Sequence, residues 1–245
     1  MRNIKEEDLD FLKDINGKRL RPDKIRFFLG GVFAYTSIPM LIMFLGVLLN
    51  GDKISLSLFE KIVVRTEAKL YILEFIFLII YMFPKVAFKL QKFQTIVILF
   101  FSIQLCTLPF MALVIRDMFG FPYNNNTLVY LSLLLLGAIA MHIVATVDIF
   151  RKVKHGGDRL EGEAISFFTN SNSRVLIGMV TYVIVLLILI FVSINFVLKP
   201  MVLYTLQTFI LYAVAIKSSE FVLLAYCRFK FPSFNITWEQ HKKEY

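Results

Sequence analysis

Three polar side chains lie inside otherwise apolar stretches of this 245-residue sequence, and they are its strongest candidates for chemistry. Lys217 and Glu220 are three residues apart, so on a helix they share one face and can form an ion pair. His142 lies in another apolar stretch, and an imidazole titrates near neutral pH. One interpretation is a proton or ion relay, with Glu220 as the carrier or ligand. The alternative is a structural ion pair that orients two helices, with Lys217 extending toward water.

Two more acidic residues lie at the edges of apolar stretches. Asp148 is expected near the cytoplasmic surface, at a depth close to that of the first three residues. Glu74 is expected near the opposite surface, where Lys69 or Arg116 could form an interfacial salt bridge with it. Proton-coupled carriers usually bury several carboxylates, whereas this reading places only Glu220 deep in the membrane. The count therefore favours the structural interpretation of the ion pair.

The sequence contains none of the motifs that identify common enzyme classes. There is no HExxH, GxSxG, P-loop or GxGxxG pattern. Cys106 and Cys227 lie in different apolar stretches and lack the spacing of metal ligands or of a disulfide pair. We therefore expect a protein that is not an enzyme and that has no metal site and no cofactor.

The elements that position these residues follow from composition. Hydrophobic residues make up 58% of the chain and charged residues 18%, against about 45–50% and about 25% in soluble domains. Long stretches without charge predict an all-α, polytopic membrane protein, because lipid offers backbone groups no partners outside a helix or closed barrel. The predicted six-helix membrane domain covers residues 27–227, between an N-terminal tail (1–26) and a C-terminal tail (228–245). Its predicted spans are 27–50, 70–88, 93–115, 127–150, 175–198 and 201–227.

The positive charges predict the orientation of this bundle. With both termini in the cytoplasm, twenty lysines and arginines lie inside and six lie outside, as the positive-inside rule requires. The net charge of +9 is thereby explained by topology, and no nucleic-acid partner is expected. Seventeen lysines against ten arginines are typical of AT-rich bacterial genomes, which predicts a location in the bacterial plasma membrane.

Two segments next to the spans have amphipathic patterns. Residues 4–15 and 54–69 are each predicted to form a short helix at a membrane surface. A basic cluster follows the first segment and comprises Lys18, Arg19, Arg21, Lys24 and Arg26. Such a cluster either attracts anionic lipids, at about 1 kcal/mol per charge, or is ordinary positive-inside anchoring.

Small residues and prolines predict how the helices pack. Gly30, Ala34 and Ser37 form a small-residue face on the first span. Ala138 and Ala145 flank His142, and Ala213 lies on the face of Lys217 and Glu220; these alanines predict close helix contacts. Pro39 and Pro109 lie within spans and predict kinks.

Two functions remain open from these patterns. The first is a non-enzymatic membrane protein that acts through helix contacts with partner proteins or with a second copy, as an accessory, assembly or immunity-type component associated with secretion. The alternative is a small ion- or proton-coupled transporter or channel that uses His142, Lys217 and Glu220. Loop lengths in the two halves would suit an inverted repeat of three spans each, although the halves share no residue-level similarity and the match in loop lengths could be a coincidence.

Overall fold

The computed structural model of this chain is helical in nearly all of the part that it describes. The described residues are Glu6, Leu9, 21–49, 56–115, 125–154 and 173–243. Their helices are α2 (Pro22–Leu49), α3 (Leu58–Met82), α4 (Pro84–Lys89), α5 (Gln91–Val114), α6 (Asn125–Lys154), α7 (Ser173–Ser193), α8 (Leu198–Lys217), α9 (Ser219–Lys230), the 3-10 turn η3 (Pro232–Phe234) and α10 (Trp238–Lys243). Helix accounts for 91% of these residues and strand for none, which confirms the all-α class.

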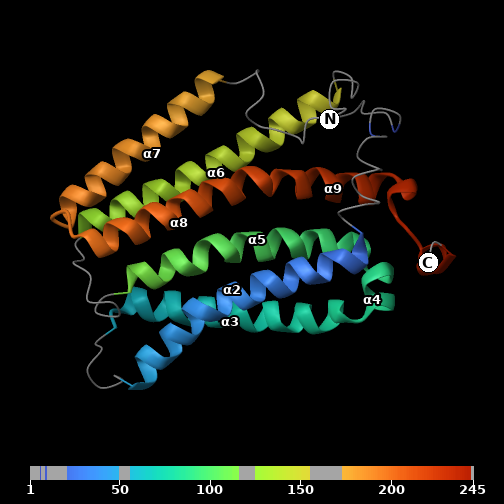
Figure 1. Cartoon of the computed structure of the whole chain (residues 1–245), viewed down its shortest axis with the longest axis horizontal. Helices are drawn as coiled ribbons and strands as arrows, with labels where there is room; N and C mark the ends of the chain where they lie inside the picture. Colours follow the sequence, from blue (N-terminus) through green and yellow to red (C-terminus); the bar gives the residue numbers. More distant parts are fainter. Residues whose placement is uncertain are drawn as a thin grey trace.

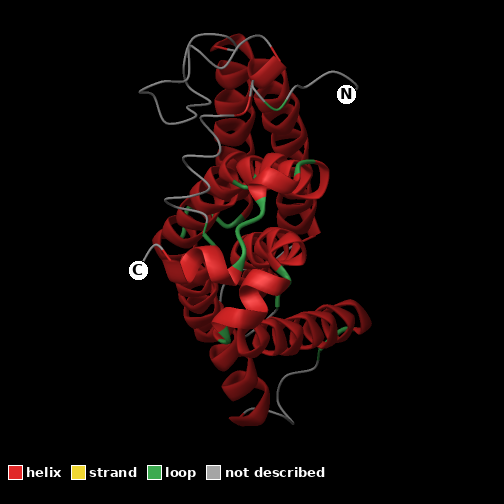
Figure 2. Cartoon of the chain, turned by 90° about the vertical axis from the view of Figure 1, so that its right-hand side faces the viewer, coloured by secondary structure: helices red, strands yellow, loops and turns green. Residues whose placement is uncertain are grey.

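The long helices form two groups that lie side by side (Figure 1). One group contains α2, α3 and α5, and the other contains α6, α7 and α8. Helix α5 lies against both α8 and α9 and so joins the two groups. Successive long helices run in opposite directions, so that the start of α2, the short helix α4 and the end of α9 meet at one end of the bundle. Figure 2 views the bundle from that end.

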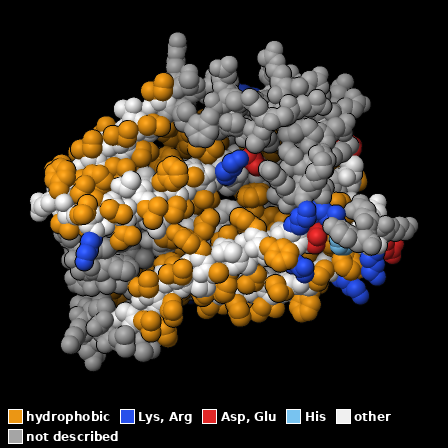
Figure 3. Space-filling view, in the orientation of Figure 1, with side chains coloured by type: hydrophobic (Ala, Val, Ile, Leu, Met, Phe, Trp, Pro, Cys, Tyr) orange, Lys and Arg blue, Asp and Glu red, His pale blue; other side chains and the backbone are white. Residues whose placement is uncertain are grey.

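Four stretches within the described residues are long and apolar enough to cross a membrane. They are Pro22–Gly46, Gln91–Pro109, Asn125–Arg151 and Leu198–Lys230. The surface agrees with this composition, since apolar side chains cover most of the face shown in Figure 3. The chain is therefore compatible with a membrane location, with four candidate spans from length and composition.

The second predicted span begins much earlier than expected. We expected a surface helix over 54–69 and a separate span over 70–88, but α3 is one continuous helix across both. Ser57 begins it with a capping box, in which the backbone N–H of Glu60 donates to the Ser57 hydroxyl and the Ser57 N–H donates to Glu60. It ends at Phe83, because Pro84 cannot continue the helix and instead starts α4.

The sixth predicted span, 201–227, is two helices rather than one. Helix α8 ends at Lys217 and α9 begins at Ser219, with Ser218 between them. The connection before α8 also differs from expectation. The turn lies at Asn195 and Phe196, whose φ angles are 53° and 54°, so the predicted loop residues Lys199 and Pro200 belong to the first turn of α8.

The prolines, and the alanines of α6, lie where the sequence predicted them to lie. Pro39 and Pro109 lie inside α2 and α5, as predicted, and α2 changes direction along its length in Figure 1. Ala138 and Ala145 are buried in contacts of α6.

Of the small-residue face of α2, Ser37 contacts Tyr71 of α3, but Gly30 and Ala34 do not pack against another described helix. A side chain added at Gly30 would meet nothing within 4 Å, and Ala34 is exposed. Helix α2 instead buries Ile25, Leu29 and Val32, whose face is rotated away from these two residues. Ala213 on α8 is also exposed rather than packed.

Candidate functional site

Helix α3 turns an acidic face toward the interior of the bundle. Glu60, Glu67, Glu74 and Tyr81 follow one another at intervals of seven residues, so they lie on one face. Their exposed fractions are 3%, 5%, 0% and 0%. The opposite side of the helix is exposed and changes character along its length: Lys61, Arg65 and Lys69 lie among apolar residues in the first half, whereas the second half is apolar, with Ile72, Ile76 and Ile79 among its residues. The distribution in the second half is inverted relative to a helix in water and suits a helix whose outer face contacts lipid.

Glu74 is held by a hydroxyl rather than by a cation. Thr36 Oγ1 on α2 donates to Glu74 Oε2 at 2.9 Å, and Glu74 Oε1 has no hydrogen-bond partner. The interfacial salt bridge predicted for Glu74 is therefore replaced by a buried contact between α2 and α3. Of its predicted partners, Lys69 makes no ion pair with it, and Arg116 lies outside the described residues.

Glu67 has a second polar side chain beside it. Gln104 of α5 lies next to the Glu67 carboxyl group and is only 1% exposed. Neither amide atom of Gln104 makes a hydrogen bond, and Glu67 Oε2 also has no partner. Between the two carboxyl groups on α3 lies Tyr71, whose hydroxyl is 2.7 Å from Ser37 Oγ on α2.

The charge of these carboxyl groups is not compensated nearby. In the described part of the chain, no lysine or arginine forms an ion pair with Glu67 or Glu74. Burying an ionised carboxylate without a counter-charge costs several kcal/mol. This interior therefore favours the neutral acids, and it can bind a positive charge whenever they ionise.

His142 lies at the break between α8 and α9. Its Nδ1 is 2.9 Å from the Ala215 carbonyl oxygen and 3.0 Å from Ser218 Oγ. Because a carbonyl oxygen only accepts, the contact with Ala215 is a hydrogen bond when Nδ1 carries the proton. Ser218 and Ser219 also donate from their hydroxyls, to the carbonyls of Ala215 and Ile216. Side chains thus satisfy the carbonyls that the break leaves open.

The predicted ion pair forms, but not in the interior. Lys217 Nζ lies 3.0 Å from Glu220 Oε1, with side chains 63% and 30% exposed. His142 contacts residues that are next to Lys217 in the sequence, as its predicted depth in the membrane suggested. Its partners are Ala215 and Ser218, however, and not Lys217 or Glu220 themselves. Asp148 is buried near the end of α6. Among the described residues, the buried acids are therefore Asp148 and the three glutamates of α3, and Glu220 is not one of them.

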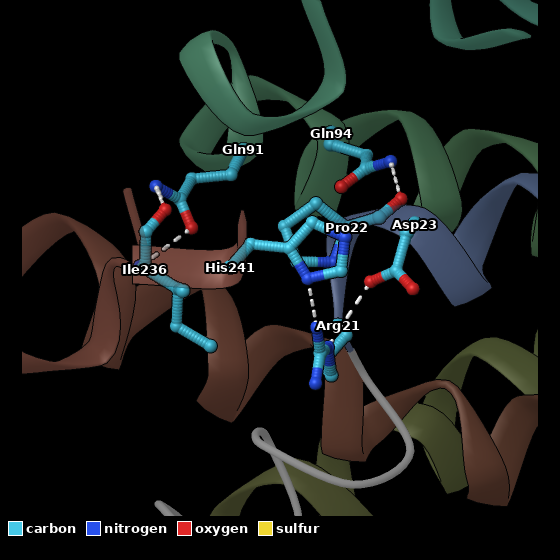
Figure 4. Close-up of polar contacts among 7 residues, drawn as sticks. All are labelled: Arg21, Pro22, Asp23, Gln91, Gln94, Ile236 and His241. Carbon is cyan, nitrogen blue, oxygen red and sulfur yellow. Dashed lines mark hydrogen bonds and ion pairs between the residues drawn. The ribbon is translucent and has the colours of Figure 1, made fainter. Parts of the chain in front are cut away.

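The C-terminal segment closes one end of the bundle through contacts that the sequence did not predict (Figure 4). The Gln91 side chain donates to the Ile236 carbonyl at 3.0 Å and accepts from the Ile236 N–H at 3.1 Å. Phe88 of α4 stacks on His241 of α10, with ring centroids 4.8 Å apart. We call η3, α10 and the residues between them (232–243) the C-terminal cap.

The cap also engages part of the predicted lipid-binding cluster. Arg21 is buried, pairs with Asp23 at 3.2 Å and contacts His241. It is therefore not free to bind anionic lipids, whereas Lys24 is exposed. Two other members of that cluster, Lys18 and Arg19, lie outside the described residues.

Sequence reasoning missed Glu67, Gln104 and Thr36. The spacing of Glu60, Glu67 and Glu74 at exact heptads was the available signal. It was hidden because the predicted boundary at residue 70 assigned the first two to a surface segment.

A comparison of the chain with protein-family models, with curated proteins and with solved structures found no match. The function is therefore inferred from the residues and their geometry.

Proposed function

We propose that this chain is a six-span protein of the bacterial plasma membrane that moves a small cation across the bilayer, using the buried carboxyl groups of α3. The observation that carries this proposal is the pair of buried acids, Glu67 and Glu74, on the inner face of a helix whose second half has an apolar outer face. Ionisable residues inside a membrane domain mark ion pathways and proton relays. The earlier objection, that too few carboxylates are buried, no longer applies.

The six-span topology adds α3 and α7 to the four candidate spans. At 1.5 Å per residue, the 25 residues of α3 and the 21 of α7 extend about 37 Å and about 31 Å, and a hydrocarbon core is about 30 Å thick. Glu67 and Glu74 do not oppose insertion of α3, because they face the interior. Lys61, Arg65 and Lys69 are exposed, and in the proposed topology their long side chains extend toward the membrane surface.

The orientation proposed has both termini in the cytoplasm. Helices α4 and α10 and the end of α9 share one end of the bundle and carry several lysines and arginines. Most of the cationic side chains visible in Figure 3 lie toward the same end. The positive-inside rule then assigns this end to the cytoplasm.

The acidic face is long enough to serve as a pathway. From Glu60 to Tyr81 there are 21 residues, which is about 32 Å along the helix axis. This length matches the thickness of the hydrocarbon core. Titratable groups at roughly equal steps thus connect the two membrane surfaces.

The test is cation flux in liposomes that contain the purified protein. We expect uptake driven by an imposed membrane potential, and its loss in both Glu67→Gln and Glu74→Gln. Glutamine has nearly the same shape as a protonated glutamate, so both variants should fold. Glu220→Gln is the matched control, because it removes an acid that is not in the interior. Flux no faster than in empty liposomes would overturn the proposal.

A second candidate is an accessory protein that acts through helix contacts. The observation that favours it is the uncovered face of α2 at Gly30 and Ala34, which leaves room for a helix of a partner or of a second copy. It predicts that a partner co-purifies in mild detergent and is lost in Gly30→Leu. Unchanged co-purification in that variant would contradict it.

A further inference from the structure

We infer that the transported cation is a proton, which Glu67 and Glu74 each bind as a neutral carboxylic acid. Transport of this proton rests on the proposed function. Binding does not, because it follows from the contacts of the two carboxyl groups alone.

The number of ligands near the two carboxyl groups suits a proton better than a metal cation. A dehydrated metal cation needs several oxygen atoms around it, and the described residues contain no group of three or more histidines, cysteines or acids that could hold one. Glu67 and Glu74 are seven residues apart, about 10.5 Å along the axis, which is too far for both to ligate one ion. A proton needs only one lone pair.

The carboxyl group of Glu67 and the amide of Gln104 complement each other in hydrogen bonding when the carboxyl group is protonated. A protonated carboxyl group can donate its O–H to the amide oxygen while its other oxygen accepts from the amide N–H. An ionised carboxylate can use only the amide N–H, so the amide oxygen stays unpaired beside a negative charge. Both amide atoms of Gln104 and Oε2 of Glu67 now lack partners in a buried location. Protonation, with a small adjustment of the side chains, satisfies them.

The surroundings of Glu74 also favour a bound proton. Its single partner in the described residues is the Thr36 hydroxyl, which can donate to either the ionised or the neutral form. With no cation beside it, the neutral form is favoured by burial. Uptake forms one O–H bond at a carboxylate oxygen and releases water from hydronium. Delivery breaks that O–H bond and passes the proton to a water molecule, which becomes hydronium, so the carboxylate is restored.

One experiment compares two gradients in the same liposomes. With sodium absent, a pH gradient should drive proton uptake, reported by an internal pH-sensitive dye. With pH equal on both sides, a sodium gradient should drive no uptake, reported by a sodium-sensitive dye. Proton uptake should be lost in Glu67→Gln and in Glu74→Gln, and retained in Glu220→Gln. Uptake that follows sodium would overturn the inference and leave the proposed function intact.

A second experiment detects the bound proton without transport. Infrared difference spectra of the full chain should contain the C=O stretching bands of two protonated carboxylic acids. One band should be missing in Glu67→Gln and the other in Glu74→Gln, and both should remain in Glu220→Gln. Absence of these bands over the whole stable pH range would overturn the inference. Bands that are present without any flux would uphold proton binding by the two acids and would reject transport, including transport of a proton.

Discussion

At the scale of single residues, Gly137 shows how side chains reach the backbone of a helix in this bundle. Tyr182 of α7 donates to the Leu133 carbonyl at 2.7 Å, and Tyr212 of α8 donates to the Leu134 carbonyl at 3.1 Å. Both tyrosines pass α6 at Gly137, where an added Cβ would lie 2.3 Å from Tyr212 Oη and 2.6 Å from Tyr182 Cε1. The missing side chain is therefore what allows both contacts.

We predict that Gly137→Ala lowers the stability of the protein by about 1–3 kcal/mol, because both rings must shift. The measurement is the thermal unfolding midpoint in detergent. Gly178→Ala is the matched control, since nothing lies within 4 Å of its added Cβ, and alanine should stabilise that helix by up to about 1 kcal/mol. Equal effects of the two substitutions would contradict this account.

We predict that Thr36→Val destabilises the protein by about 1–3 kcal/mol, because the nearly isosteric valine removes the only hydrogen bond to Glu74 in the described residues. Thr205→Val provides the comparison. Its exposed hydroxyl donates only to the Met201 carbonyl of its own helix, so the unfolding midpoint should hardly change. A control that loses as much stability as Thr36→Val would show that the contact with Glu74 is unimportant.

Sequence spacing predicted contacts within a helix better than contacts between helices. The Lys217–Glu220 pair follows directly from its spacing. The contacts of Glu74 with Thr36 and of Glu67 with Gln104 depend on how α3 is rotated against α2 and α5. Periodicity alone does not determine that rotation for a helix with an apolar outer face.

At the scale of elements, the break at Ser218 determines where the nearby charged side chains lie. Hydropathy is continuous across the break, so sequence reasoning expected one helix. The structure ends α8 at Lys217, whose last carbonyls accept from His142 and from the Ser218 and Ser219 hydroxyls. The nearby Lys217–Glu220 pair lies on the surface of this joint.

We predict that the double variant Lys217→Leu with Glu220→Gln retains both flux and stability, to within about 1 kcal/mol, because exposed ion pairs contribute little. His142→Leu should cost about 0.5–1.5 kcal/mol, since the Ala215 carbonyl loses one of its two side-chain donors and keeps the Ser218 hydroxyl. Thermal unfolding and liposome flux of both variants provide the measurement. A larger loss from the double variant than from His142→Leu would reverse the assigned roles.

At the scale of the whole molecule, composition was the most informative property. It correctly predicted an all-α fold and a membrane-compatible surface, and four of the expected spans are long and apolar enough. The start of α3 was misplaced because its first half carries glutamates, lysines and an arginine, which lower the hydropathy of that segment. The C-terminal cap could not be predicted, because its contacts join residues up to 220 positions apart.

The six-span topology predicts opposite exposure of Lys199 and Lys242. Each is exposed, at the start of α8 and in α10 respectively. A membrane-impermeant maleimide should label Lys199→Cys in intact cells and Lys242→Cys only after permeabilisation. The natural Cys106 and Cys227 are buried, so background labelling should be low. The six-span topology requires one membrane crossing between Lys199 and Lys242. Labelling of both positions from the same side would contradict it.

The C-terminal cap has a consequence for biosynthesis. Ile236 and His241 contact Gln91, Phe88 and Arg21, which leave the ribosome long before them. Chains fold in large part from the N-terminus as they are made, so this end of the bundle closes only after residues 232–243 have been made. A chain that stops before residue 232 lacks these contacts, so Phe88 and Gln91 stay uncovered and accessible to membrane proteases.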